Sequence, residues 1–206
     1  KEMLGINHSL TISCLNNIVK EMLGINHSLT ISCLNNIGTV YQDKECYEEA
    51  EKIYLQVSNI RKELFGNDHS DTIVSIINLG TLYVEKGDFS KSEFFFKEAI
   101  ILLKNKISKN DNLRDKNLLR IATLDLAATY YKLYRFKESE TLCIYSLEIS
   151  EELYGNEHPS TALVLKDLAD LYLAMGKFSK AEDLCLKALK IREKSPIRIG
   201  SRMGRP

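Results

Sequence analysis

The sequence NIGTVY (36–41) recurs along the chain as NLGTLY (78–83), DLAATY (125–130) and DLADLY (167–172). The steps between successive copies are 42, 47 and 42 residues. Each copy ends in Tyr and has a small residue, Gly or Ala, three positions before it. Self-similarity at a period of this size is typical of arrays in which every copy is one supersecondary unit.

A second set of small residues keeps the same register, at Ala50, Ser92, Ser139 and Ala181. Between the two sets, apolar residues recur every three to four positions, and polar turns such as KGD (86–88) interrupt them. This pattern predicts two antiparallel amphipathic helices per unit. We expect the repeat region to span 20–194, with helix pairs at about 28–66, 70–107, 118–155 and 159–194.

A third motif recurs as LGINHSLT (4–11 and 23–30), FGNDHSDT (65–72) and YGNEHPST (154–161). Its Gly predicts a left-handed cap at the end of one helix, and the residues after His predict the start of the next. Four histidines in equivalent positions could suggest a metal site. However, neighbouring helices pack roughly 10 Å apart, whereas zinc ligands lie about 2.0–2.3 Å from one ion. We therefore predict a structural role for these histidines and no metal.

Composition excludes several classes of function. Lys plus Arg and Asp plus Glu number 28 each, so no net field favours nucleic acid or an anionic membrane. No segment approaches the roughly 20 apolar residues of a membrane span. The five cysteines form no CxxC pair, which indicates reduced thiols and a cytoplasmic protein. No nucleophile, phosphate-binding or metalloprotease motif occurs in a workable context, so we expect neither an enzyme nor a cofactor.

The repeat columns resemble the tetratricopeptide repeat (TPR), and HPSTALVLKDLADLYLAMGKFSKAEDLCLKALKIREK (158–194) is the most similar segment. The long period and the LG-x-x-HP-x-T linker resemble the kinesin light chain subfamily. This resemblance implies an all-α fold, with helix-turn-helix repeats stacked in a right-handed superhelical solenoid. It also implies a protein-interaction scaffold or adaptor whose first helices line a concave groove for a peptide or helix of a partner protein.

By the same resemblance, the residue preceding the Leu-Gly position contacts the backbone of the ligand. The groove positions that this implies are Asn35, Asn36, Thr39, Gln42, Val74, Ile77, Asn78, Thr81, Ile121, Leu124, Asp125, Tyr131, Lys166, Asp167 and Asp170. The apolar members predict one or two buried hydrophobic anchors of the ligand. Alternatively, they simply pack against a neighbouring helix. Acidic residues outnumber basic ones in this set, which does not suit the tryptophan-acidic cargo motifs of kinesin light chains.

Three segments depart from the period. Residues 1–18 recur unchanged as 20–37, so 1–19 is either an extra N-terminal helix that takes the place of a second helix, or a duplication artefact with a frayed end. The polar run 104–117 predicts an extended loop, and the basic tail 195–206 predicts disorder. Since no polar capping helix follows Lys194, self-association through uncapped ends is a further expectation. The alternative function is a structural or autoregulatory segment that contacts an effector domain of the same protein.

Overall fold

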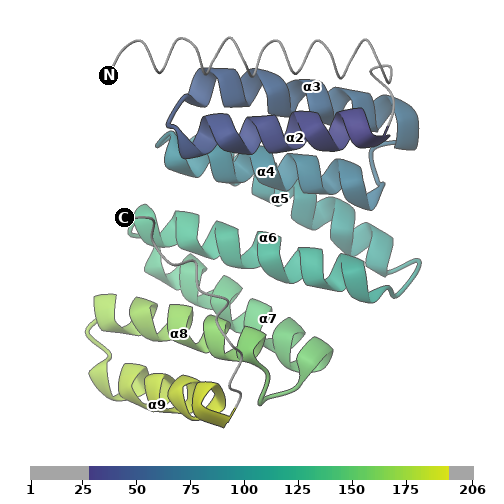
Figure 1. Ribbon diagram of the computed structural model, residues 1–206. Coiled ribbons are helices and arrows are strands. Elements are labelled where there is room, and N and C mark those ends of the chain that lie inside the picture. Colours follow the sequence, from purple (N-terminus) through teal and green to yellow (C-terminus); the bar gives the residue numbers. More distant parts are fainter. Residues whose placement is uncertain (1–27, 195–206) are drawn as a thin grey trace. The chain divides into compact units, whose positions relative to one another are not determined.

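The computed structural model describes residues 28–194, which form eight helices and no strand (Figure 1). These helices fall into two compact units, one ending at Lys109 and the other beginning at Asn110. The helices of unit 1 are α2 (Ser28–Asp43), α3 (Tyr47–Phe65), α4 (Ser70–Glu85) and α5 (Phe89–Ile107). Those of unit 2 are α6 (Leu113–Lys132), α7 (Phe136–Tyr154), α8 (Pro159–Ala174) and α9 (Phe178–Lys194). The all-α prediction is confirmed.

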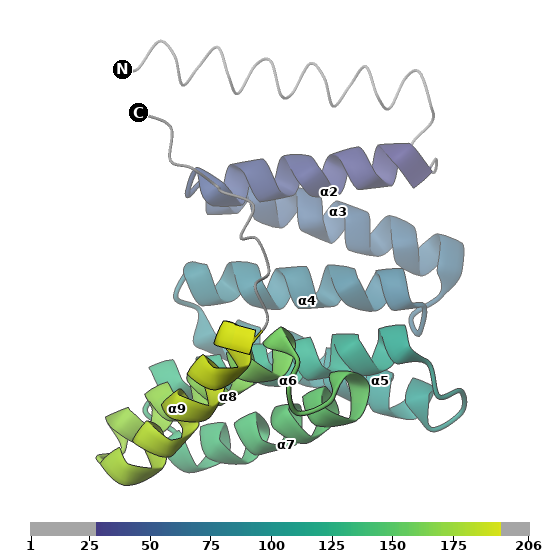
Figure 2. The same ribbon diagram turned by 60° about the horizontal axis from the view of Figure 1, so that its bottom comes forward.

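Within each unit the helices form two antiparallel pairs, visible in both views (Figures 1 and 2). In unit 1, α2 packs against α3 and α4 against α5, and α3 also contacts α4. In unit 2, α6 packs against α7 and α8 against α9, with α7 also in contact with α8. We call α2, α4, α6 and α8 the first helices and α3, α5, α7 and α9 the second helices.

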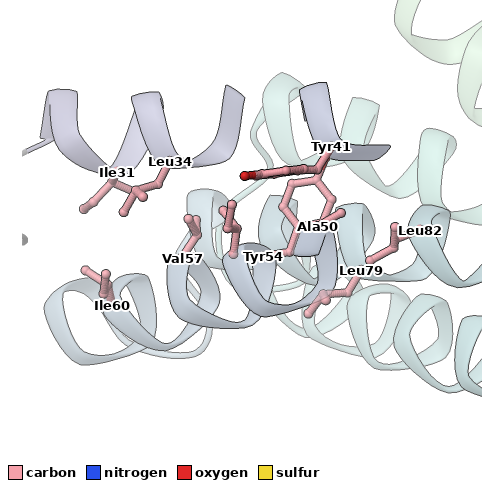
Figure 3. Close-up of a cluster of buried hydrophobic side chains, with 10 residues drawn as sticks. Ile31, Leu34, Tyr41, Ala50, Tyr54, Val57, Ile60, Leu79 and Leu82 are labelled. Carbon is pink, nitrogen blue, oxygen red and sulfur yellow. The ribbon is translucent and has the colours of Figure 1, made fainter. Parts of the chain in front are cut away.

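The core of each pair is built from the periodic apolar residues. In the first pair, Ile31 and Leu34 point from α2 towards α3, which contributes Val57 and Ile60 (Figure 3). Leu82 of α4 belongs to the same cluster, which joins the second pair to the first. Fully burying side chains of this size contributes roughly 1.5–3 kcal/mol each. The stack within a unit is therefore stabilised mainly by apolar contact.

The turn inside each pair requires a positive φ at one equivalent position. Gly87 and Gly176 have φ values of 79° and 71° there, which glycine adopts without strain. The other two pairs place Glu45 and Tyr134 at this position, with φ of 61° and 59°. A left-handed backbone costs a residue with a Cβ roughly 1–2 kcal/mol. These two turns are therefore strained.

The linker motif explains the recurring spacing of Gly, His and Thr. Nδ1 of His158 accepts a hydrogen bond from the Ser160 amide at 3.1 Å and so caps α8. The Thr161 hydroxyl donates back to the Gly155 carbonyl at 2.9 Å. The Tyr154 ring stacks on His158 with centroids 4.7 Å apart. The structural role predicted for the linker histidines is confirmed at His158.

The earlier linker has the same construction. His69 caps α4 by accepting from the Asp71 amide at 3.2 Å, and Thr72 donates to the Gly66 carbonyl at 2.9 Å. One detail of the prediction is wrong. Gly66 and Gly155 have positive φ but ψ near 170°, an extended conformation reserved for glycine rather than the left-handed helical cap.

The polar run 104–117 is mostly helical, contrary to the expected long loop. Helix α5 continues to Ile107 and α6 begins at Leu113, so only 108–112 connects them. The Asn112 side chain caps α6, accepting from the Arg114 amide at 2.8 Å. Lys116 bonds Asp111 and also Glu152 on α7. Capping and ion pairs hold this segment instead of an apolar stripe. The expected N-terminal helix in 1–19 and the tail 195–206 lie outside the described residues.

Candidate functional site

The predicted groove residues all lie on first helices, and the two units differ in how these residues are used. In unit 1 the polar members bond to one another. Nδ2 of Asn78 donates to Oδ1 of Asn35 at 3.0 Å, which ties α4 to α2. The Tyr54 hydroxyl of α3 donates to Oε1 of Gln42 at 2.9 Å and lies 3.1 Å from the Thr39 hydroxyl. The first of these bonds joins the two pairs, and the Tyr54 bonds lie within the first pair.

The remaining unit 1 candidates divide by exposure. Ile77 is only 6% exposed, so the alternative interpretation, packing against neighbouring helices, applies to it. Val74 is half-buried, and the half-buried Thr81 hydroxyl bonds the Ile77 carbonyl of its own helix at 3.2 Å. Asn36 is exposed and takes no part in these hydrogen bonds. Among the predicted site residues of unit 1, Asn36 and Thr39 are exposed, and Thr39 lies within hydrogen-bond distance of Tyr54.

Unit 2 contains a pocket of about 400 Å³ that is lined in part by its own predicted groove residues. It opens between the two first helices α6 and α8, with α7 contributing to its wall. Its lining combines residues of all three helices, namely Leu124, Ala127, Ala128, Tyr131, Ser139, Cys143, Asp167, Asp170, Leu171, Leu173 and Ala174. Four of these, Leu124, Tyr131, Asp167 and Asp170, were predicted from the sequence. The face selected for a groove thus holds a pocket in this unit.

The rim of the pocket is acidic. Lys166 pairs with both carboxylates, Asp170 through a short hydrogen bond and Asp167 at 3.7 Å. One cation therefore faces two anions. Burial raises the pKa of Asp167, with Lys166 opposing this effect and Asp170 adding to it. The side chain of Asp170 is half exposed and accessible to a ligand.

Asp125, on α6 beside the pocket, adds to the same field. Burial raises its pKa to about 6; nearby Arg120 opposes this rise and Asp167 adds to it. Asp125 is not part of the pocket wall, and neither is the half-buried Ile121. Tyr131 does line the pocket, and its ring packs 5.9 Å from the Phe136 ring.

Sequence reasoning missed the part of the pocket contributed by the second helix. Ser139 and Cys143 belong to α7, whereas the prediction considered first helices alone. Burial raises the pKa of the Cys143 thiol to about 11, so it is a neutral wall residue and not a nucleophile. A signal was present in the sequence, because this column changes from Tyr54 and Phe96 to Cys143.

Comparison with known families identifies the repeats. Residues 29–105 and 119–194 match the family model described as tetratricopeptide repeat. The chain belongs to the tetratricopeptide repeat family. The two matched segments contain the four helix pairs described above, apart from their outermost residues. A comparison with curated protein sequences finds no match.

Solved structures with a similar fold are kinesin light chain-like TPR proteins. One is a crystal structure of the TPR-like repeats of a predicted kinesin light chain from Podosopora anserina, whose repeats are nearly identical to one another. Its sequence is 19% identical to this chain, and the TM-score is 0.68 over 90% of this chain and 86% of that one. A point variant of the same repeats is 18% identical, with a TM-score of 0.70 over 89% and 84%. BtubC (BKLC) from P. vanneervenii is 16% identical, with a TM-score of 0.72 over 97% and 83%. At such identities the likeness establishes the fold.

The TPR fold supports a repeat scaffold for protein interaction. Within residues 28–194, no helix is both long and apolar enough to cross a membrane. The same part of the chain contains no cluster of three or more His, Cys, Asp or Glu that could hold a metal ion.

Proposed function

We propose that this TPR protein is an adaptor that binds an extended segment of a partner protein along its first helices. The observation that carries the proposal is the pocket of unit 2, because it opens at four of the residues predicted for a peptide groove. Pockets with apolar walls and a few polar groups are typical ligand sites. The apolar wall would bind a hydrophobic side chain of the partner, and the acidic rim would favour partner segments with basic residues next to that side chain.

The test is a selection of random peptides on the purified protein, followed by binding measurements with variants. The groove variant combines Leu124→Ala with Asp170→Ala, two residues that line the pocket. The control variant combines Glu182→Ala with Lys187→Ala, which are exposed on α9 and absent from the pocket wall. Enriched peptides should bind the control as tightly as wild type and the groove variant at least tenfold more weakly. If the enriched peptides bind the groove variant as tightly as wild type and lose affinity only for the control variant, a groove function is contradicted.

A second candidate is a repeat segment that packs against another part of its own polypeptide or against a second copy. The exposed side of α9 favours it, because Leu189 is 55% exposed whereas Ser58, the equivalent residue of α3, is 3% exposed. If this surface mediates self-association, Leu189→Glu should reduce the molar mass measured by light scattering. A wild-type protein that is monomeric at high concentration argues against self-association.

We place this activity in the cytoplasm, in keeping with the cysteine pattern of the sequence. Within the described residues, the cysteines Cys33, Cys46, Cys143 and Cys185 are free thiols. Fractionation of source cells with an antibody to the chain would test the location. The adaptor role itself requires no chemistry from these residues, since Cys143 is neutral and serves as a wall of the pocket.

A further inference from the structure

The pocket of unit 2 lies at a repeat position whose equivalents in unit 1 hold an aromatic ring. In the first pair a Cβ built on Gly38 would lie 2.5 Å from Cε1 of Tyr54. In the second pair, a Cβ on Gly80 would lie 2.6 Å from Cε1 of Phe96. The glycine of the first helix therefore makes room for the ring of the second helix.

The third pair changes both partners of this contact. Ala127 occupies the glycine position and Cys143 the aromatic position. The Ala127 methyl would collide with a ring placed as in the first two pairs, and Cys143 provides none. The fourth pair has the same two residue types, Ala169 and Cys185. Ala127 and Cys143 both line the pocket of about 400 Å³. The pocket thus adjoins the position at which the first two pairs carry a ring, and α8 supplies the rest of its wall.

The surroundings of the pocket support this correspondence. The Tyr54 hydroxyl contacts Thr39 and Gln42, and the equivalent residues in the third pair, Ala128 and Tyr131, line the pocket. Leu82, which packs in the Tyr54 cluster, corresponds to Leu171 of the pocket wall. The walls that enclose a ring in unit 1 are therefore present in unit 2 without their ring.

The volume and charge of the pocket define what could fill it. An apolar cavity of about 150 Å³ is sufficient to bind benzene, so the pocket admits a complete aromatic side chain. Beside the first pair, Asn78 and Thr81 of α4 stand where the pocket has Asp167 and Asp170. The neutral border has thus become acidic, with Lys166 as its paired cation. A ligand with its own cation beside the ring would complement the remaining negative charge.

We propose that this pocket binds a Phe or Tyr side chain of a partner segment, with an adjacent Lys or Arg of that segment contacting Asp170. The proposal rests on the adaptor function and specifies the chemistry of its ligand. The ring of the ligand lies in the pocket beside the Ala127 methyl and Cys143, in the space that the larger side chains Tyr54 and Phe96 fill in the first two pairs. The cation beside it determines the preference among aromatic peptides.

The test uses the acetylated and amidated peptide GSKFKSG as the probe, and NMR titration of the full chain as the measurement. Two matched peptides replace Phe by Ala, or both Lys by Glu. Wild-type protein should bind GSKFKSG at least tenfold more tightly than either matched peptide, with amide shifts at Ala127, Ala128 and Leu171. Equal affinity for the three peptides, or shifts confined to other residues, would overturn the proposal.

The decisive variant is Ala127→Gly with Cys143→Phe, which rebuilds the packing of the first two pairs and fills the pocket from within. It should lose at least tenfold in affinity for GSKFKSG while its melting temperature stays equal to or above that of wild type. If this variant fails to fold, Ala128→Leu blocks the exposed mouth instead, with Ala128→Ser as its control. Unchanged binding to the filled or blocked pocket would overturn the proposal.

Failure of this inference can be distinguished from failure of the adaptor function. Peptides from the random selection that lose binding to the Leu124→Ala, Asp170→Ala variant but bind the filled-pocket variant normally would leave the adaptor function in place. The aromatic pocket alone would then be wrong. If every selected peptide binds the Leu124→Ala, Asp170→Ala variant as tightly as wild type, the adaptor function itself is wrong.

Discussion

The contact of Gly80 with Phe96 allows a quantitative test of how the helix pairs are packed. A methyl group at Gly80 would lie 2.6 Å from Cε1 and 2.8 Å from Cδ1 of a ring that is 0% exposed. Because the ring is fully buried, Gly80→Ala should incur an overpacking cost of about 1–3 kcal/mol. Alanine recovers roughly 1 kcal/mol through its higher helix propensity. We expect a net loss of roughly 0–2 kcal/mol in the free energy of unfolding.

Phe96→Cys alone leaves a cavity and should cost about 2–4 kcal/mol, slightly less than truncation of a buried Phe to Ala. The double variant, Gly80→Ala with Phe96→Cys, has the residue types that the third pair has at Ala127 and Cys143. In this variant the new methyl group at position 80 no longer contacts an aromatic ring. We therefore expect it to be more stable than the sum of the single effects by roughly 1–3 kcal/mol, a coupling typical of residues in contact. Urea unfolding followed by far-ultraviolet circular dichroism measures all four proteins, since the chain has no Trp.

Gly87→Ala is the matched control for this cycle. Gly87 has a φ of 79°, and a Cβ there would meet no atom within 4 Å. Its substitution costs backbone strain alone and should add to Phe96→Cys within about 0.5 kcal/mol. If Gly80→Ala and Phe96→Cys are no more strongly coupled than this control pair, the packing argument is refuted, and with it the explanation of the pocket.

Three further predictions concern the turns, the caps and the buried carboxylate. Tyr134→Gly should raise the free energy of unfolding by about 0.5–1 kcal/mol in urea titration, because it relieves a φ of 59°; a loss of stability would contradict the strain. His158→Ala should lose about 1 kcal/mol by the same measurement, while His158→Asn retains the cap of α8; equal losses would exclude capping. Burial raises the pKa of Asp125 from 3.8 to about 6, so its contribution to stability is complete below pH 4 and is lost as the pH rises through 6. Asp125→Asn should therefore be more stable than wild type at pH 7.5 by about 1–2 kcal/mol, and the fall in stability between pH 4 and 6 should become smaller; an unchanged pH profile would show that Asp125 is not the group responsible.

The repeat register could be predicted from the sequence because three independent motifs share it. Apolar spacing identified both helices of each pair, and the turn KGD (86–88) separated them correctly. The polar run 104–117 was misjudged because its helical ends have no apolar stripe. They are stabilised by the Asn112 cap and by the bonds of Lys116 to Asp111 and Glu152, which depend on the position of α7. Such interactions across helices have no local periodicity in the sequence.

The candidate site was predicted in its first-helix half alone. Leu124, Tyr131, Asp167 and Asp170 could be predicted from their positions in the repeat. The space between them, however, depends on the small side chain of Cys143, which replaces an aromatic residue of the first two pairs. A change in side-chain size at a core position predicts a cavity only when the residues that contact this position are known. The strained turns at Glu45 and Tyr134 were hidden for a similar reason, since neither residue type favours a positive φ.

A repeat architecture also explains how the chain can hold an under-filled core at one pair. Each pair in such an array contacts only its neighbours, so the cost of a cavity is confined to the pair that contains it. Here the cost is further reduced, because Ala127 replaces a glycine and favours its helix by roughly 1 kcal/mol. The first two pairs keep the ring and provide apolar stability, as Phe96 shows by its complete burial. A ring supplied by a ligand would then fill in the third pair the space that the first two pairs fill with their own aromatic residue, and binding should stabilise unit 2 selectively.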